Sequence, residues 1–124
     1  MLSKGLRDEE KEKVSEVFNR LLEMPFVPEL WESQQKQQVS KKLKEILDLA
    51  LGEIETISNE EFCLRIKEAN LEFNQYEQFG DLLLKTAEVE EEENISFLAE
   101  RAGAVYQLAQ QESKNLLIYF NAEN

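Results

Sequence analysis

The sequence predicts an all-α protein that folds as an antiparallel helical bundle. Its 124 residues include two prolines and four glycines, so few positions interrupt a helix. Apolar residues recur at helical spacing, and β-branched residues are too scattered to form alternating strands. We expect three long helices and a shorter N-terminal helix, joined by tight connections. An apolar fraction of 42% is enough for one core, which indicates a single domain over residues 1–124.

The first helix is predicted from about Asp8 to Glu23. Acidic residues at its start suit the positive end of the helix dipole. Its apolar face is formed by Val14, Val17, Phe18, Leu21 and Leu22. Pro25 disfavours helical geometry at Met24, and Pro28 suits the first position of the next helix. The segment between these two prolines is therefore predicted to be a connector.

A second helix is predicted from Pro28 to about Ile57, but its first third has a different pattern. Val39 begins an apolar stripe that continues to the end of this helix. Leu30 and Trp31, by contrast, are followed by a glutamine-rich stretch and have no stripe to join. Either this end projects beyond the bundle or a short separate helix covers it.

Trp31 is therefore a candidate partner-binding residue, together with Phe26 and Leu30. Tryptophan is enriched among the residues that anchor protein interfaces. We expect Trp31 to be partly exposed or to lie in a subunit contact. In the alternative interpretation, these side chains cap one end of the bundle core.

The third helix has the clearest start signal in the chain. Ser58 is followed three positions later by Glu61, the pattern of a capping box. Apolar and small residues then alternate at spacings of four and three, which is typical of helices packed side by side. They are Phe62, Ile66, Ala69, Phe73, Tyr76, Gly80, Leu83 and Ala87. A fourth helix follows the acidic run, and its apolar arc from Ile95 to Phe120 is wide enough to need more than one neighbour.

An alternative places a break at Phe79-Gly80-Asp81, with Asp81 capping a new helix. Large and small residues around this point resemble the pattern of a tetratricopeptide helical hairpin. They are Tyr76, Phe79, Gly80 and Leu83, followed by Ala102, Tyr106 and Ala109. The resemblance covers about a quarter of the chain and implies a repeat-like arrangement of helical hairpins broken near Gly80.

The composition excludes the common catalytic constellations. With no histidine, the chain has no imidazole base, no Ser-His or Cys-His pair and no Glu-x-x-His ligand motif. We expect no catalytic residue, no cofactor and no metal. Cys63 is the sole cysteine, and the N-terminus lacks a continuous apolar stretch. Both features predict a cytoplasmic protein.

The charge balance argues against two classes of partner. Fourteen bases and 26 acids give a net charge of −12, which repels nucleic acids and anionic membranes. Acids are most concentrated in the run that includes Glu90, Glu91, Glu92 and Glu93, a candidate site for a basic partner. The alternative interpretation is a solvated helix end, since the run lacks the glycine and the spacing of a calcium loop.

The sequence therefore predicts a small acidic, non-enzymatic protein interaction module whose partner is unknown. We expect a homodimer, because the predicted helices carry more apolar surface than a short bundle needs. The alternative is an acidic inhibitor or immunity-type protein that blocks a basic active site or mimics nucleic acid. An enzyme would need a buried pair of glutamates in a cleft.

Overall fold

The protein is all-helical over residues 2–123, the part that the computed structural model describes, with side chains described for residues 9–114. In chain order the elements are α1 (Leu2–Glu23), α2 (Pro28–Leu30), the π-helical turn η1 (Trp31–Gln35), α3 (Lys36–Leu47), α4 (Leu51–Thr56), α5 (Asn59–Glu68), α6 (Phe73–Ala87) and α7 (Glu92–Glu123). No strand occurs over these residues. The predicted fold class is confirmed at this level.

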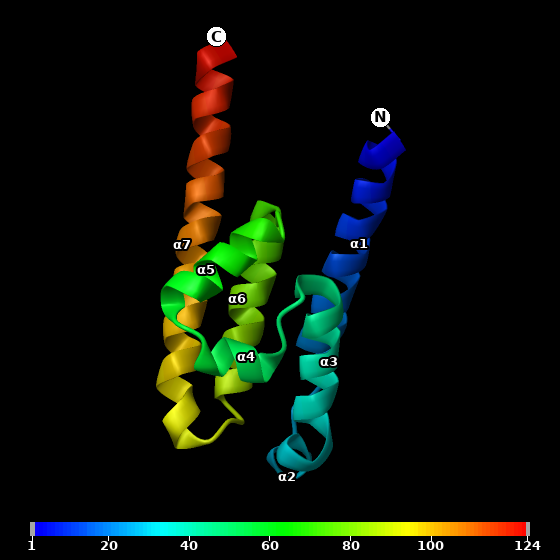
Figure 1. Cartoon of the computed structure of the whole chain (residues 1–124), viewed down its shortest axis with the longest axis vertical. Coiled ribbons are helices and arrows are strands. Elements are labelled where there is room, and N and C mark those ends of the chain that lie inside the picture. The colour runs from blue at the N-terminus through cyan, green and yellow to red at the C-terminus, as the bar shows by residue number, and fades with distance from the viewer. Residues whose placement is uncertain (1, 124) are drawn as a thin grey trace.

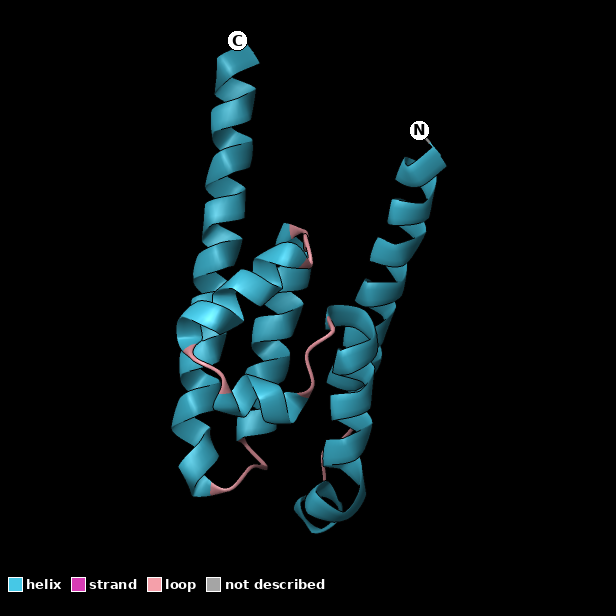
Figure 2. Ribbon diagram, in the orientation of Figure 1, coloured by secondary structure: helices cyan, strands magenta, loops and turns pink. Residues whose placement is uncertain are grey.

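The helices form two antiparallel pairs with two short helices packed across them (Figure 1). The α6–α7 hairpin is one pair, and α1 lies along α6 while also contacting α3. Helices α4 and α5 both contact α7. Short loops connect the elements, as Figure 2 shows. The N-terminal part of α1 and the C-terminal part of α7 both extend beyond the other helices at the same end of the molecule.

The second predicted helix is broken where the sequence predicts continuity. α3 ends at Leu47 because Asp48 adopts the left-handed conformation, with φ of 56°. The chain restarts as α4 at Leu51, where the Glu53 carboxylate accepts a hydrogen bond from the Ala50 N–H at 3.0 Å. This reversal turns Leu51 and Ile54 into the core, where both are fully buried.

The third predicted helix is also divided, at Asn70, whose φ is 58°. The predicted Ser58 cap is confirmed, since Ser58 Oγ accepts a hydrogen bond from the Glu61 N–H at 3.1 Å. The alternative break at Gly80 is wrong, because α6 runs through this residue without interruption. The N-terminal helix is longer than expected, since it begins at Leu2. The division into three long helices and a shorter one therefore differs from the structure.

One apolar cluster joins α1, η1, α3, α4, α5, α6 and α7. Phe79 lies at its centre, stacked on Phe18 of α1 with ring centroids 5.7 Å apart and packed against Phe62 of α5 at 6.1 Å. Leu43 from α3 and Leu98 from α7 belong to the same cluster, and both are fully buried. Among the described residues, no helix combines the length and the apolarity that crossing a bilayer requires.

Candidate functional site

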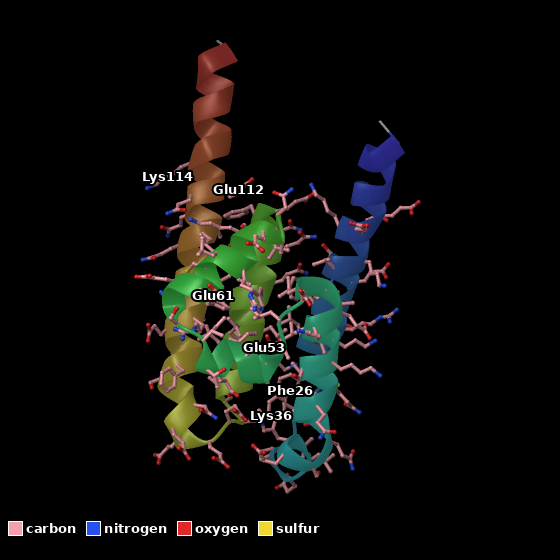
Figure 3. The ribbon with its side chains drawn as sticks, in the orientation of Figure 1. Phe26, Lys36, Glu53, Glu61, Glu112 and Lys114 are labelled. Atoms are coloured by element: carbon pink, nitrogen blue, oxygen red, sulfur yellow. The ribbon has the colours of Figure 1, made fainter. Side chains whose placement is uncertain are left out.

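A polar cluster lies buried where the π-helical turn meets the turn between α6 and α7. We call Trp31, Lys36, Glu55, Glu90 and Asn94 the carboxyl junction. Its members come from η1, α3, α4, the α6–α7 turn and α7. Figure 3 labels Lys36 near the end of the molecule where this cluster lies.

The local sequence explains how Trp31 enters this cluster. Gln35 is buried, its Nε2 donates to the Pro25 carbonyl at 2.9 Å, and its Oε1 accepts from the Val27 N–H at 2.8 Å. These bonds hold the connector between the two prolines against the helix that follows. The Lys36 N–H donates to the Trp31 carbonyl five residues earlier, the pattern of a π turn, which often occurs at functional positions.

Trp31 is fully buried, so the expectation of partial exposure is wrong. Its ring packs against Phe26 with centroids 4.9 Å apart, and its Nε1 donates to Glu90 Oε1 at 2.6 Å. A buried indole N–H needs an acceptor, and Glu90 provides one from 59 residues away. The interpretation in which these side chains cap one end of the core describes Trp31 correctly. Leu30, in contrast, is 40% exposed.

Glu90 is also not part of the acidic surface that the sequence predicts. Its side chain is fully buried, whereas Glu91, Glu92 and Glu93 are exposed. Glu90 Oε2 accepts hydrogen bonds from Lys36 Nζ and from Asn94 Nδ2, both at 3.0 Å. The sequence run therefore mixes one structural carboxylate with three solvated ones.

Glu55 is the second carboxyl group of the junction. Lys36 Nζ lies 3.6 Å from its Oε1, and its Oε2 is buried with no hydrogen-bond partner among the described residues. Burial, followed by the neighbouring Glu90 carboxylate, raises the pKa of Glu55 to about 7. Burial alone would also raise the pKa of Glu90, but the neighbouring Glu55 carboxyl group and the hydrogen bonds from Trp31 and Lys36 outweigh it and lower that pKa. The structure therefore contains the buried glutamate pair that an enzyme would need, although neither carboxyl group lines the grooves described below.

Two further cations hold helix ends, and neither was predicted. Lys85 Nζ of α6 donates to the carbonyls of Leu21, Leu22 and Met24 at the end of α1, and it lies 4.2 Å above the Phe26 ring. Burial lowers the pKa of Lys85. Arg101 of α7 has the same role for α4, since its guanidinium donates to the carbonyls of Ile54 and Ile57. No local sequence signal marks such contacts between distant helices.

A groove lies along the contact between α1 and α3. A hollow of about 420 Å³ is lined by Val17, Arg20, Leu21, Met24, Gln38, Lys41, Lys42 and Glu45. A second hollow of about 490 Å³ includes Glu45 and continues along α1 past Val14 and Lys13 to Glu10. We call the two hollows together the α1–α3 groove. Both hollows include Glu45, and their lining residues on α1 run from Met24 to Glu10. The second hollow is also lined by Glu68, Ala69, Asn70, Leu71 and Gln75 at and beside the α5–α6 turn.

The rim of the α1–α3 groove is locally basic in an acidic protein. Lys42 lies 3.8 Å from Glu45, but Lys41 and Arg20 have no ion-pair partner among the described residues. The four lysines between positions 36 and 44 are thus only partly neutralised: Lys36 and Lys44 pair with acids on other elements. Arg20 and Lys41 are therefore available at the first hollow to attract a negatively charged ligand.

No known family model, curated protein or solved structure matches the chain. Among the described residues, no group of three or more acids or cysteines is arranged to hold a metal ion.

Proposed function

We propose that this protein is a small, non-enzymatic, cytoplasmic interaction module whose α1–α3 groove binds an amphipathic helix from a partner protein. The hollow at Val17, Leu21 and Met24 carries this proposal, because it is a mainly apolar depression between α1 and α3 that the cations of Arg20 and Lys41 border. A helix that lies in such a groove buries apolar anchors at positions i, i+3 or i+4, and i+7.

The floor of the groove suits apolar anchors. Val17 and Leu21 are buried by the fold, and Met24 lies half-buried at one end. Methionine fits differently shaped partners because its side chain is flexible and polarisable. From Glu10 to Met24 the groove follows about 21 Å of α1 at 1.5 Å per residue, enough for roughly four turns of a bound helix.

The rim indicates the charge of the partner. Arg20 and Lys41 are both exposed and border the same hollow. Glutamates flanking the apolar face of a partner helix would pair with them, and such pairs increase the association rate and the selectivity more than the affinity. The proposed ligand is therefore an acidic amphipathic helix.

The test uses a synthetic helical peptide with leucines at i, i+4 and i+7 flanked by glutamates. We expect fluorescence anisotropy to show binding to the wild-type protein, and Lys41→Glu to weaken it by about tenfold or more. Lys114→Glu is the matched control, because Lys114 is an exposed lysine on α7, away from the groove (Figure 3). Equal binding by the wild type and by Lys41→Glu contradicts the proposal.

The same variants test the native partner. Affinity capture from the source cells with the wild type, Lys41→Glu and Lys114→Glu, followed by mass spectrometry, is expected to yield a protein lost only with Lys41→Glu. A second copy of this chain would be the occupant if sedimentation velocity shows a wild-type dimer that Lys41→Glu dissociates. That result would support the predicted homodimer.

An inhibitor that uses the acidic surface is the second candidate. Glu91, Glu92 and Glu93 are exposed, and Phe97, one helical turn after Glu93 on α7, is 45% exposed. An apolar side chain beside unpaired carboxylates suits a basic protein surface. Binding through this patch is expected to weaken steeply with salt and to be unaffected by Lys41→Glu.

A further inference from the structure

The carboxyl junction has more negative than positive groups in a buried place. Glu55 and Glu90 both approach the single ammonium of Lys36, at 3.6 and 3.0 Å. The Glu90 side chain is fully buried and that of Glu55 is 8% exposed. If both carboxyl groups were ionised, one negative charge would remain unpaired in a poorly solvated site, which is costly.

The hydrogen bonds show which group stays ionised. Glu90 accepts from Trp31, Lys36 and Asn94, so three donors stabilise its carboxylate. Glu55 Oε2 has no donor at all among the described residues, although it is buried. A protonated carboxyl group can donate a hydrogen bond as well as accept one. Glu55 and Glu90 lie beside each other, since Glu55 Oε1 and Glu90 Oε2 approach the same Lys36 ammonium at 3.6 and 3.0 Å.

We propose that Glu55 and Glu90 form a proton-binding site in which one proton, carried by Glu55 and donated to Glu90, holds α4 against the α6–α7 turn. The bonded carboxyl pair leaves one carboxylate facing one ammonium, so the site is electrically balanced. Loss of the proton places a second anion beside Glu90. This weakens the contact of Glu90 with Trp31 and therefore the attachment of the π-helical turn.

The charged groups facing the pair are few. Lys36 of α3 faces both carboxyl groups, and Glu32 of η1 acts on Lys36. The buried environment raises the pKa of Glu55 to about 7, so both forms are populated near neutral pH. The chain contains no histidine, so no imidazole titrates in the same range. The junction would give a histidine-free protein a response to pH. This proton site is separate from the α1–α3 groove and does not depend on it.

Trp31 is a built-in reporter, because it is the one tryptophan in the sequence and its Nε1 donates to Glu90. We expect the indole N–H resonance in a nitrogen-15 correlation spectrum to shift with a midpoint near pH 7. In Glu55→Gln the shift should disappear, since a neutral amide donates to Glu90 at every pH. Glu61→Gln, an exposed glutamate on α5 (Figure 3), is the control and should keep the wild-type midpoint.

Carbon-13 detection of the Glu55 carboxyl resonance tests the proposal without any substitution. A midpoint near 7 supports it. A midpoint near 4.5, the value of a solvated glutamate, overturns it. So does an indole shift that persists in a folded Glu55→Gln protein.

Discussion

Gly80 of α6 lies directly under the ring of Tyr106 of α7. A Cβ at position 80 would be 2.6 Å from Tyr106 Cε1 and 2.8 Å from Cζ. The ring cannot easily move aside, because the Tyr106 hydroxyl donates to Asp81 Oδ1 at 2.5 Å. Burial, followed by Asp81, raises the pKa of Tyr106 to about 12, so the phenol stays protonated and keeps this bond. Glycine is therefore needed here for close approach of two helices.

Gly80→Ala is expected to destabilise the protein. Overpacking typically costs about 1–3 kcal/mol, whereas alanine gains about 1 kcal/mol of helix propensity. We expect urea denaturation to show a net loss of up to about 2 kcal/mol. Gly52→Ala and Gly103→Ala are matched controls, because nothing lies within 4 Å of a Cβ at either position. Both should be neutral or stabilising, and a Tyr106→Ala background should remove the cost of Gly80→Ala.

This contact shows what sequence pattern alone can and cannot provide. The seam that contains Gly80 predicted side-by-side helices, and the structure pairs α6 with α7. Pattern alone gave two explanations for the glycine, a helix break or a close approach. The choice depends on Tyr106, which lies on another helix, so no local signal distinguishes them.

The breaks at Asp48 and Asn70 were missed for a related reason. Asp and Asn adopt left-handed geometry more readily than most residues, but each also occurs within helices. Burial of Leu51 and Leu71 after the breaks favours the reversals, and it depends on the assembled core. Local sequence signals predicted the structure correctly where the two partners are close in sequence, as in the helix cap formed by Ser58 and the Glu61 N–H. The carboxyl junction joins residues as far apart as Trp31 and Glu90, so periodicity could not identify it.

Removing the Lys85 ammonium is expected to loosen the end of α1. Lys85→Met keeps much of the aliphatic stem but leaves the carbonyls of Leu21, Leu22 and Met24 without this donor. Buried groups that lose their partner typically cost about 1–3 kcal/mol. We expect thermal unfolding to show a loss in that range. Lys67→Met, at an exposed lysine on α5, should change stability by no more than about 0.5 kcal/mol. Equal effects of the two substitutions would contradict the role of Lys85.

We expect the Glu55 carboxyl group of the carboxyl junction to make the folded protein less stable as the pH rises from about 4.5 to 7. The pKa of Glu55 is raised in the folded state, so the native protein binds more protons than the unfolded chain between about pH 4.5 and 7. The contribution of Glu55 to the free energy of unfolding is complete below about pH 4.5 and is lost as the pH rises through 7. Glu90 acts oppositely: its lowered pKa makes stability fall as the pH drops below about 4.5.

The measurement is the free energy of unfolding in urea from pH 4 to 8, for the wild type and Glu55→Gln. We expect the difference in the free energy of unfolding between the wild type and Glu55→Gln to change across this pH interval. The net charge of −12 also favours lower pH through general repulsion, but salt screens that effect far more than it screens a buried pair. The difference should therefore persist at 0.5 M salt. Parallel curves for the two proteins would eliminate Glu55 as the source.

We call the turn between Thr56 and Asn59 the α4–α5 corner. Arg101 is expected to hold this corner through the several N–H donors of its planar guanidinium. Its guanidinium donates to the carbonyls of Ile54 and Ile57 at 3.3 and 2.6 Å and to Asn59 Oδ1 at 3.2 Å. The residue is 4% exposed and lies over the Phe62 ring, 5.7 Å from its centroid. Lysine has one compact ammonium and cannot reproduce this planar fork.

Arg101→Lys should therefore cost about 1–3 kcal/mol in the free energy of unfolding. Hydrogen exchange should speed up most at the amides of α4 and the start of α5, because the carbonyls at their junction lose a shared donor. Arg65→Lys is the matched control: Arg65 is 35% exposed at its side chain and makes ion pairs with Glu53 and Glu61. Such partly solvated pairs contribute at most about 1 kcal/mol. If exchange in α4 is unchanged in Arg101→Lys, or if Arg65→Lys is equally damaging, the corner is held by apolar packing alone.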